Sequence, residues 1–148
     1  MRYLVTGANG YLGRGIVRKL LDDGNDVYAV DFSTELIDSK AKCFSVNLFT
    51  VVDPYEYFGR PDILIPLAWR NGFVHNDISH IEDLILHMNF FESMLKAGLK
   101  RLCVMGSMHE IGFYEGSIDA NTSCNPLNLY GIAKNTLRQI TSLLCDKY

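Results

Sequence analysis

Residues 6–13 read Thr6-Gly7-Ala8-Asn9-Gly10-Tyr11-Leu12-Gly13, and this stretch decides how the 148-residue chain folds. The run Arg2–Thr6 before it is typical of a β-strand, and the residues after it are apolar at helical spacing. The three glycines thus join a strand to a helix, with a spacing one residue wider than the common G-x-G-x-x-G fingerprint. Such a turn brings backbone N–H groups and the positive end of a helix close to a pyrophosphate. The sequence therefore predicts dinucleotide contacts at Gly7, Asn9, Gly10, Tyr11, Leu12 and Gly13.

Asp31 ends a second strand-like run, Asp26–Asp31. A carboxylate at this place can accept hydrogen bonds from both hydroxyls of an adenosine ribose, and it would repel a 2′-phosphate. No arginine stands in the following Phe32–Thr34 to hold that phosphate. We therefore expect NAD as the cofactor, and Arg14 is the one nearby basic residue that leaves NADP as the less favoured alternative.

Strand-like and helix-like segments alternate along the whole chain. Strands are predicted at 2–6, 26–31, 43–46, 62–68 and 101–105, and helices at 11–23, 77–97 and 129–147. Continuous Val, Ile and Leu runs that alternate with helices are typical of a parallel sheet covered on both faces. We expect an α/β fold with a doubly wound, Rossmann-like sheet in the order 3-2-1-4-5. Its ligand crevice should lie beside the first and fourth strands.

The fifth strand raises a question about the end of the chain. A sixth strand normally lies beside the fifth in such a sheet, and none follows the helix at 129–147. Leu102–Met105 would then be a bare hydrophobic edge, which native proteins avoid. We expect residues 1–148 to be an NAD(P)-binding Rossmann-like domain, truncated after its last helix and without its C-terminal substrate domain, or else a chain whose edge a partner covers.

Composition limits the partners and the compartment. A net charge of −3 provides no basic surface for nucleic acid or an anionic membrane. No apolar run approaches the roughly 18 residues of a membrane span. Met1–Val5 leads straight into the glycine turn, so we expect no signal peptide. The four cysteines show no zinc spacing, so no metal site is predicted. Scattered thiols fit a reducing, cytoplasmic location.

Tyr130 and Lys134 lie four residues apart in the last predicted helix, so their side chains share one face. A free phenol is a poor base near neutral pH. A neighbouring ammonium favours the phenolate form and so suits the phenol to acid–base catalysis. Tyr-x-x-x-Lys alone is a frequent chance pattern, but with the glycine turn upstream it predicts a nicotinamide-dependent redox site.

The chain resembles the N-terminal half of an extended short-chain dehydrogenase/reductase, within the NAD-dependent epimerase/dehydratase family of nucleotide-sugar enzymes. The matching segments follow the family's order: Thr6–Gly13, Asp31, Leu67-Ala68, Asn89, Met105-Gly106-Ser107, Asn125-Pro126 and Tyr130–Lys134. The resemblance implies an NAD-dependent enzyme that moves a hydride between a sugar carbon and the nicotinamide. It implies that Tyr130 exchanges a proton with the substrate oxygen, that Ser107 hydrogen-bonds that oxygen, and that Lys134 holds the nicotinamide ribose.

The resemblance also implies cofactor contacts outside the glycine turn. These are Asp31, Asn47, Leu48, Leu67, Ala68, Tyr130 and Lys134. Asn47 stands where family members usually carry an aspartate that contacts adenine, and its side-chain carbonyl would be a weaker substitute.

The two residues that directly follow Ser107 differ from those of one group within the family. Sugar 4,6-dehydratases place Asp and Glu directly after the catalytic hydroxyl residue to eliminate water, whereas this chain has Met108 and His109. We therefore expect an epimerase, which is an isomerase, or a ketoreductase. His109 and Glu110 are predicted to contact sugar hydroxyls or to act as an auxiliary acid or base. An ordinary pair of loop residues that supports the site is the equal alternative.

The long helix at 77–97 carries two apolar rows. The row predicted to face the core is Ile78, Ile81, Ile85, Met88 and Leu95, and the second row is Leu86, Phe90 and Met94. Enzymes that resemble this chain commonly dimerise through this helix and the Tyr-Lys helix. We therefore expect a homodimer through helices 77–97 and 129–147, unless a missing C-terminal segment covers the second row.

Two other functions remain open beside an NAD-dependent oxidoreductase or epimerase of a nucleotide-activated sugar. A non-catalytic dinucleotide-binding module would need the glycine turn but not Ser107, Tyr130 and Lys134, so their presence argues against it. An NADP-dependent reductase of a non-sugar carbonyl compound could be excluded only by the residues that bind the substrate.

Overall fold

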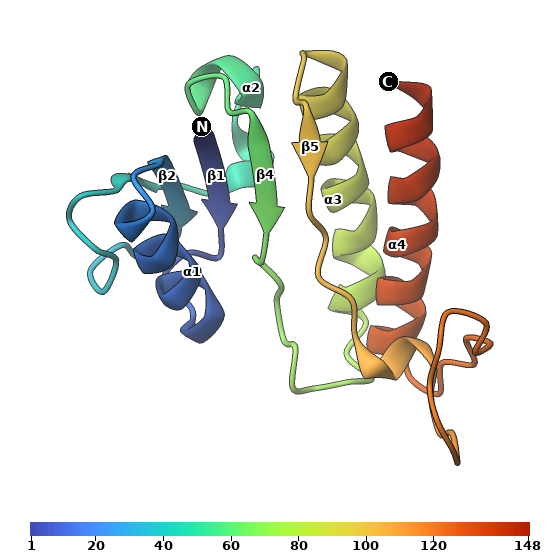
Figure 1. Ribbon diagram of the computed structural model, residues 1–148. Helices are drawn as coiled ribbons and strands as arrows, with labels where there is room; N and C mark the ends of the chain where they lie inside the picture. Colours follow the sequence, from blue (N-terminus) through green and yellow to red (C-terminus); the bar gives the residue numbers. More distant parts are fainter.

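The computed structural model describes all 148 residues. Five parallel strands form one sheet in the order β3-β2-β1-β4-β5, which confirms the predicted doubly wound order. The elements are β1 (Arg2–Thr6), α1 (Tyr11–Asp22), β2 (Asp26–Asp31), β3 (Lys42–Ser45), the 3-10 helix η1 (Leu48–Thr50), α2 (Pro54–Tyr57), β4 (Ile63–Pro66), α3 (Ser79–Lys96), β5 (Arg101–Leu102), the 3-10 helix η2 (Met108–Glu110) and α4 (Leu129–Lys147). Helix α1 covers one face of the sheet, and α3 and α4 lie side by side against the other (Figure 1).

Alternate residues of the same strands build the two halves of the core. Leu4 and Val30 belong to the larger cluster on the α3 side, whereas Val5 and Ala29 belong to the smaller cluster on the α1 side. The larger cluster is rich in aromatic side chains, including Phe58, Phe90 and Phe91. Because both faces are covered, the strands read as continuous apolar runs.

The two apolar rows of helix α3 match the prediction only in part. Phe90 and Met94 of the supposed outer row are buried, whereas Ile78 and Ile85 of the supposed core row are 59% and 54% exposed. The prediction was wrong for these four residues and right for Leu95, which is buried. Apolar side chains lie around most of this helix, so their period alone does not say which face is covered. The outward row Ile78, Ile81 and Ile85 leaves an exposed apolar surface on the first half of α3.

Strand β5 is shorter than the predicted 101–105, because only Arg101 and Leu102 pair with β4. One further bond follows, from the Cys103 N–H to the Leu64 carbonyl at 2.9 Å. β5 is the edge of the sheet, and beyond it the chain leads into η2 and the site. No helix combines the length and the apolar character that crossing a bilayer requires.

Candidate cofactor and catalytic site

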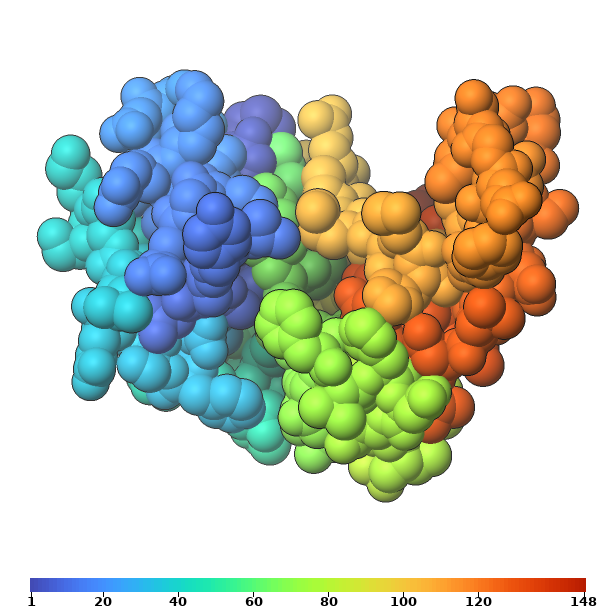
Figure 2. All heavy atoms as spheres, turned by 90° about the horizontal axis from the view of Figure 1, so that it is seen from below, coloured from blue at the N-terminus to red at the C-terminus, as the bar shows by residue number.

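A groove with a volume of about 520 Å³ lies at the carboxyl ends of β1, β2 and β4. Seven of the predicted cofactor residues line it: Gly7, Gly10, Asp31, Asn47, Leu48, Leu67 and Ala68. Figure 2 shows this end of the molecule, where the green segment after β4 lies between the blue N-terminal part and the orange-red C-terminal part. Parallel strands end together at one edge, and this is why residues so far apart in sequence meet here.

The protein's own backbone excludes side chains at two of the three glycines. Gly7 has a φ of +64°, and a Cβ there would lie 2.5 Å from the backbone nitrogen of Ala68. A Cβ on Gly13 would overlap the carbonyl oxygen of Gly7. Gly10 is less crowded, since its nearest neighbour would be the Gly7 oxygen at 3.2 Å. Internal packing therefore accounts for Gly7 and Gly13, while Gly10 keeps the backbone open toward the groove.

The first turn of α1 is free to bind an anion. Gly10 is the N-cap residue of this helix and supplies no side-chain acceptor, and the first turn holds no acidic residue. The N–H groups of the first turn lack partners inside any helix, and the helix dipole adds partial positive charge there. Tyr11 and Leu12 contribute only their backbone to this turn, because their side chains are exposed and do not line the groove. The geometry fits a pyrophosphate.

Asp31 ties the end of β2 to the glycine turn. Its Oδ2 accepts a hydrogen bond from the Asn9 N–H at 2.9 Å, and its Oδ1 accepts one from the Phe32 N–H at 2.8 Å. The Asn9 side chain in turn accepts a bond from the Leu36 N–H at 3.1 Å. Each carboxylate oxygen has two acceptor positions, so Asp31 can still receive ribose hydroxyls while it orders the turn.

Asn47 lines the groove, but the side-chain atom that is free to bind a ligand is not the expected one. Its Oδ1 caps η1 by accepting a hydrogen bond from the Phe49 N–H at 3.1 Å. The side-chain carbonyl, the predicted adenine contact, is thus already engaged. The Nδ2 amide makes no bond within the chain, so Asn47 offers a ligand mainly a donor.

The four histidines of the chain gather around Tyr130 and Trp69, a cluster that we call the histidine box. Three imidazole centroids lie 5.8, 5.2 and 5.4 Å from the Tyr130 ring centroid, those of His75, His80 and His109. The fourth, His87, stacks on Trp69 at 5.0 Å, and the Trp69 ring meets the Tyr130 ring edge-on at 5.9 Å. Loop 67–78, helix α3, η2 and helix α4 each contribute to the box.

Hydrogen bonds set the tautomers of two of these histidines. The indole N–H of Trp69 can only donate, and it donates to His80 Nδ1 at 3.0 Å. His80 Nε2 therefore carries the proton that the Val74 carbonyl accepts at 3.1 Å. Both nitrogens of the buried His80 are thus satisfied, and the residue fixes the loop after β4.

The same reasoning applies to His109. Asn128 caps α4 through its Oδ1, which accepts a bond from the Gly131 N–H at 2.8 Å. Its Nδ2 therefore faces His109 Nδ1, at 2.9 Å, and donates to it. This leaves the proton of the neutral ring on Nε2, so His109 is a hydrogen-bond donor toward the site. The expected role as an auxiliary base is less compatible with this geometry.

Lys134 is 7% exposed, and its ammonium lies 4.9 Å from the centre of the Trp69 ring. Burial lowers the pKa of Lys134 below its usual value, and the nearby Glu110 carboxylate opposes that effect. Burial also lowers the pKa of His87 to about 4, where Asp83 favours the charged form and Lys134 disfavours it. His87 is therefore neutral at physiological pH, and neither of its ring nitrogens has a hydrogen-bond partner within the chain.

The three predicted catalytic side chains are not joined to one another by hydrogen bonds. The Tyr130 hydroxyl has no partner within the chain, while the Tyr130 N–H donates to the His75 carbonyl at 2.9 Å. Ser107 Oγ accepts a bond from the His109 N–H at 3.3 Å, which leaves the Ser107 hydroxyl proton free to donate elsewhere. Glu110 does not point to an open substrate site, because it is buried and both carboxylate oxygens are bound within the chain.

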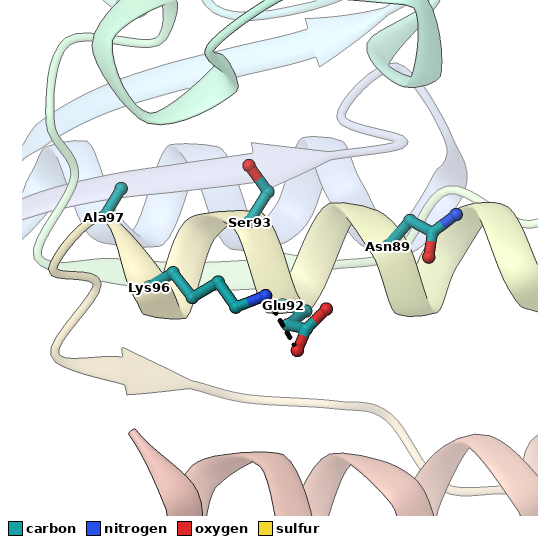
Figure 3. A pocket seen from close by; sticks show the side chains of 5 residues that line it. All are labelled: Asn89, Glu92, Ser93, Lys96 and Ala97. Atoms are coloured by element: carbon teal, nitrogen blue, oxygen red, sulfur yellow. Dashed lines mark ion pairs between the residues drawn. The ribbon is translucent and has the colours of Figure 1, made fainter.

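Helix α3 contributes residues that the sequence did not assign to the groove: Asp83, Leu86 and His87. Arg70 lines the groove as well, and its Nε and Nη2 both lie 2.9 Å from the Asp83 carboxylate. Asn89, which matches the family pattern in sequence, instead lines a separate hollow with Glu92, Ser93, Lys96 and Ala97 (Figure 3). The single tryptophan directly after Leu67-Ala68 was the sequence signal that could have revealed this wall of the site.

The family model for the NAD dependent epimerase/dehydratase family matches residues 3–148. The dTDP-6-deoxy-L-talose 4-dehydrogenase (NAD(+)) of Aggregatibacter actinomycetemcomitans is 43% identical over 144 residues, which are 94% of this chain and 53% of that protein. The UDP-glucose 4-epimerase of Lactobacillus helveticus is 27% identical over 156 residues, covering 95% of this chain and 46% of that protein. The chain thus spans about half the length of the curated relatives it matches.

Solved structures show the same fold. The UDP-glucose 4-epimerase of Thermotoga maritima with UDP-glucose has a TM-score of 0.87 at 21% identity, covering 100% of this chain and 52% of that chain. The Thermus thermophilus UDP-glucose 4-epimerase in complex with NAD has a TM-score of 0.82 at 23% identity, with the same coverage of 100% and 52%. At these identities the likeness confirms the Rossmann-like fold and no more.

Proposed function

The chain belongs to the NAD-dependent epimerase/dehydratase family, and from this premise we propose that it holds the cofactor and the proton-transfer residues of an NAD-dependent oxidoreductase. Its substrate would be a nucleotide-activated sugar. The single observation that carries the proposal is the groove in which Gly7, Gly10 and Asp31 meet at the carboxyl ends of the strands. NAD would accept or supply the hydride when bound.

The groove residues fit the parts of NAD one by one. The first-turn amides of α1 would bind the pyrophosphate, and Asp31 would bind the adenosine ribose. Asn47 and Leu48 would line the adenine end, and Leu67 and Ala68 the middle of the groove. NAD is favoured over NADP because Asp31 would repel a 2′-phosphate, and the NAD(+) in the name of the 43% identical relative agrees with this.

Proton transfer would take place on the face of α4 next to the histidine box. Tyr130 would exchange a proton with the reacting oxygen of the sugar, and the free hydroxyl proton of Ser107 would hydrogen-bond the same oxygen. Lys134 would hold the nicotinamide ribose and favour the phenolate of Tyr130 by its charge. His109 would donate from Nε2 to a neighbouring sugar hydroxyl, which is the first of the two roles expected from the sequence.

Two candidate reactions are suggested by the names of two relatives. The 43% identical relative supports hydride transfer at the 4-position of a dTDP-6-deoxyhexose. The second candidate is a 4-epimerase, supported by the 27% identical UDP-glucose 4-epimerase. The two differ in cofactor balance. A dehydrogenase interconverts one NAD and one NADH for each sugar, whereas an epimerase regenerates its cofactor within each turnover.

An activity assay on the intact protein distinguishes the two reactions. The protein would be incubated with NAD or NADH and with dTDP-6-deoxyhexoses or UDP-hexoses, while NADH absorbance and sugar products are followed. Stoichiometric change in NADH supports the dehydrogenase, and a new sugar epimer without such a change supports the epimerase. Tyr130→Phe should lower either rate by about 100-fold or more. Tight NAD binding with no turnover of any nucleotide sugar would instead indicate a non-catalytic module.

Three further features belong to the same proposal. A segment absent from this chain would supply the substrate domain, since the relatives are about twice as long. The exposed row Ile78, Ile81 and Ile85 of α3 would meet a second copy, together with α4, in a homodimer. A monomeric mass at high protein concentration would contradict the dimer. The four free thiols favour the cytoplasm.

A further inference from the structure

Glu110 is a buried carboxylate that joins two parts of the site. It is 4% exposed, its Oε1 accepts the Ser107 N–H at 2.8 Å, and its Oε2 accepts Arg138 Nε at 2.8 Å. Both bonds are charge-assisted, and such bonds are stronger than neutral ones. A buried charge with a unique set of partners holds those partners at a fixed separation.

The two partners of Glu110 lie on the two elements that carry the proposed proton-transfer residues. Ser107 begins η2, where Glu110 completes a capping box with it. Arg138 lies one helical turn after Lys134 and two turns after Tyr130, so the three share one side of α4. The two elements also touch, because a Cβ on Gly131 would overlap the His109 carbonyl.

From this geometry we propose that Glu110 is a positioning residue, which sets the distance between the Ser107 hydroxyl and the Tyr130–Lys134 face of α4. The inference rests on the proposed function and deepens it. The bond to the Ser107 backbone orients the residue that must donate to the substrate oxygen, and the bond to Arg138 prevents η2 from sliding along α4. Glu110 itself would touch neither the cofactor nor the substrate.

The charge of Glu110 supports a second contribution, to Lys134. The ammonium of Lys134 lies 4.9 Å from the centre of the Trp69 ring, on which the neutral His87 also stacks, and the Glu110 carboxylate acts on it through its charge. Of these, only Glu110 raises the pKa of Lys134, against the effect of burial. Removing the carboxylate charge should therefore let Lys134 lose its proton at lower pH.

The matched pair for a test is Glu110→Gln and Asp62→Asn. Asp62 binds a backbone N–H and a cation in the same way, with the Arg2 N–H at 2.9 Å and Lys100 Nζ at 2.6 Å. It joins β1 to the segment before β5, at the amino ends of the strands and away from the groove. Both substitutions keep the shape of the side chain and remove the charge, so both should lower the melting temperature.

The kinetic arm compares kcat, KM and the dissociation constant for NADH in the folded intact protein. Glu110→Gln should lower kcat by about tenfold or more, with the NADH dissociation constant changed less than about threefold. Asp62→Asn should keep the wild-type kcat. A wild-type kcat for folded Glu110→Gln would overturn the proposal, because a merely structural carboxylate affects only the amount of folded protein.

A second arm needs no turnover and so separates the two proposals. Hydrogen exchange of the Ser107 amide and NMR titration of Lys134 are measured in wild type and Glu110→Gln. Faster exchange at Ser107 and a lower titration midpoint for Lys134 support the positioning role, and unchanged values for both would overturn it. If the wild type binds NADH but turns over no nucleotide sugar, the proposed function fails, while this arm still decides the role of Glu110.

Discussion

The ammonium of Lys134 lies 4.9 Å from the centre of the Trp69 ring, and this indole borders both the groove and Tyr130. A cation over an indole face gains some attraction from the ring quadrupole. Burial nevertheless lowers the pKa of Lys134, because the folded protein disfavours its charged form relative to the unfolded chain. A buried basic side chain whose surroundings disfavour its charge is better explained by chemistry than by stability.

Lys134→Met should therefore stabilise the fold and damage activity. Methionine fills the same space without a charge, and we expect the free energy of unfolding to rise by about 1 kcal/mol. Turnover should fall by about 100-fold or more. Denaturant titration and initial rates measure the two effects. Lys96→Met on the exposed part of α3 is the matched control, with stability within about 0.5 kcal/mol of wild type and normal rates. Destabilisation by Lys134→Met would contradict the argument.

Gly7→Ala and Gly15→Ala should act in opposite directions. Gly7 has a positive φ, and its new methyl group would press on the Ala68 backbone, so we expect a loss of about 1–3 kcal/mol and weaker NAD binding. Gly15 lies inside α1 with no atom near its Cβ position, and alanine there should add about 0.5–1 kcal/mol. Thermal unfolding and calorimetric titration with NAD check both. Equal effects at the two glycines would exclude a special role for the turn.

Asp31→Asn should weaken NAD binding and reduce the preference over NADP. The amide can no longer accept the Asn9 and Phe32 N–H groups together with two ribose hydroxyls with the strength of a carboxylate. We expect NAD affinity to fall by about tenfold, or about 1.4 kcal/mol, while NADP affinity stays level or rises. Asp26→Asn, at the exposed start of the same strand, is the control and should change neither affinity. Tighter binding of NADP than NAD by the wild type would reverse the cofactor assignment.

His87 should make stability depend on pH in a defined window. Its pKa is lowered from 6.5 to about 4 in the folded protein, so between these values the unfolded chain binds more protons. His87 therefore does not reduce the free energy of unfolding above pH 6.5. As the pH falls toward 4, protonation of this residue in the unfolded chain lowers that free energy by about 3 kcal/mol in all. His87→Phe keeps an aromatic ring against Trp69 and Phe49 but cannot titrate. Denaturant titrations across this window should show the free energy of unfolding falling with pH in the wild type more than in His87→Phe. Equal pH dependence in the two proteins would contradict the burial of His87.

The sheet and its last helix were predictable because local signals agreed with the tertiary fold. Arg2–Thr6 and Asp26–Asp31 have the predicted bounds of β1 and β2, and 129–147 those of α4. The glycine turn also predicted how the chain passes from β1 into α1 and where the groove lies. These segments combine strand or helix propensity, apolar pattern and clear end signals.

The rest depended on contacts that no local pattern encodes. The orientation of α3 is set by Phe90 and Met94 packing against the sheet, and the competing row at Ile78 and Ile85 was equally periodic in sequence. The engaged carbonyl of Asn47 follows from a three-residue helix that periodicity does not reveal. The histidine box likewise arises only when four separate elements converge. Spacing could nominate Tyr130 and Lys134, but it could not predict that the Lys134 ammonium lies over the Trp69 indole.

Trp69 is the only tryptophan of the chain, and it borders the groove, Tyr130 and Lys134 at once. Its ultraviolet emission is thus a built-in optical reporter of this one place. Quenching by a bound nucleotide, or energy transfer to reduced nicotinamide, would register ligand arrival without any attached dye. The fluorescence of Trp69 therefore follows ligand binding in the groove, and every variant that keeps the indole can be studied by the same signal.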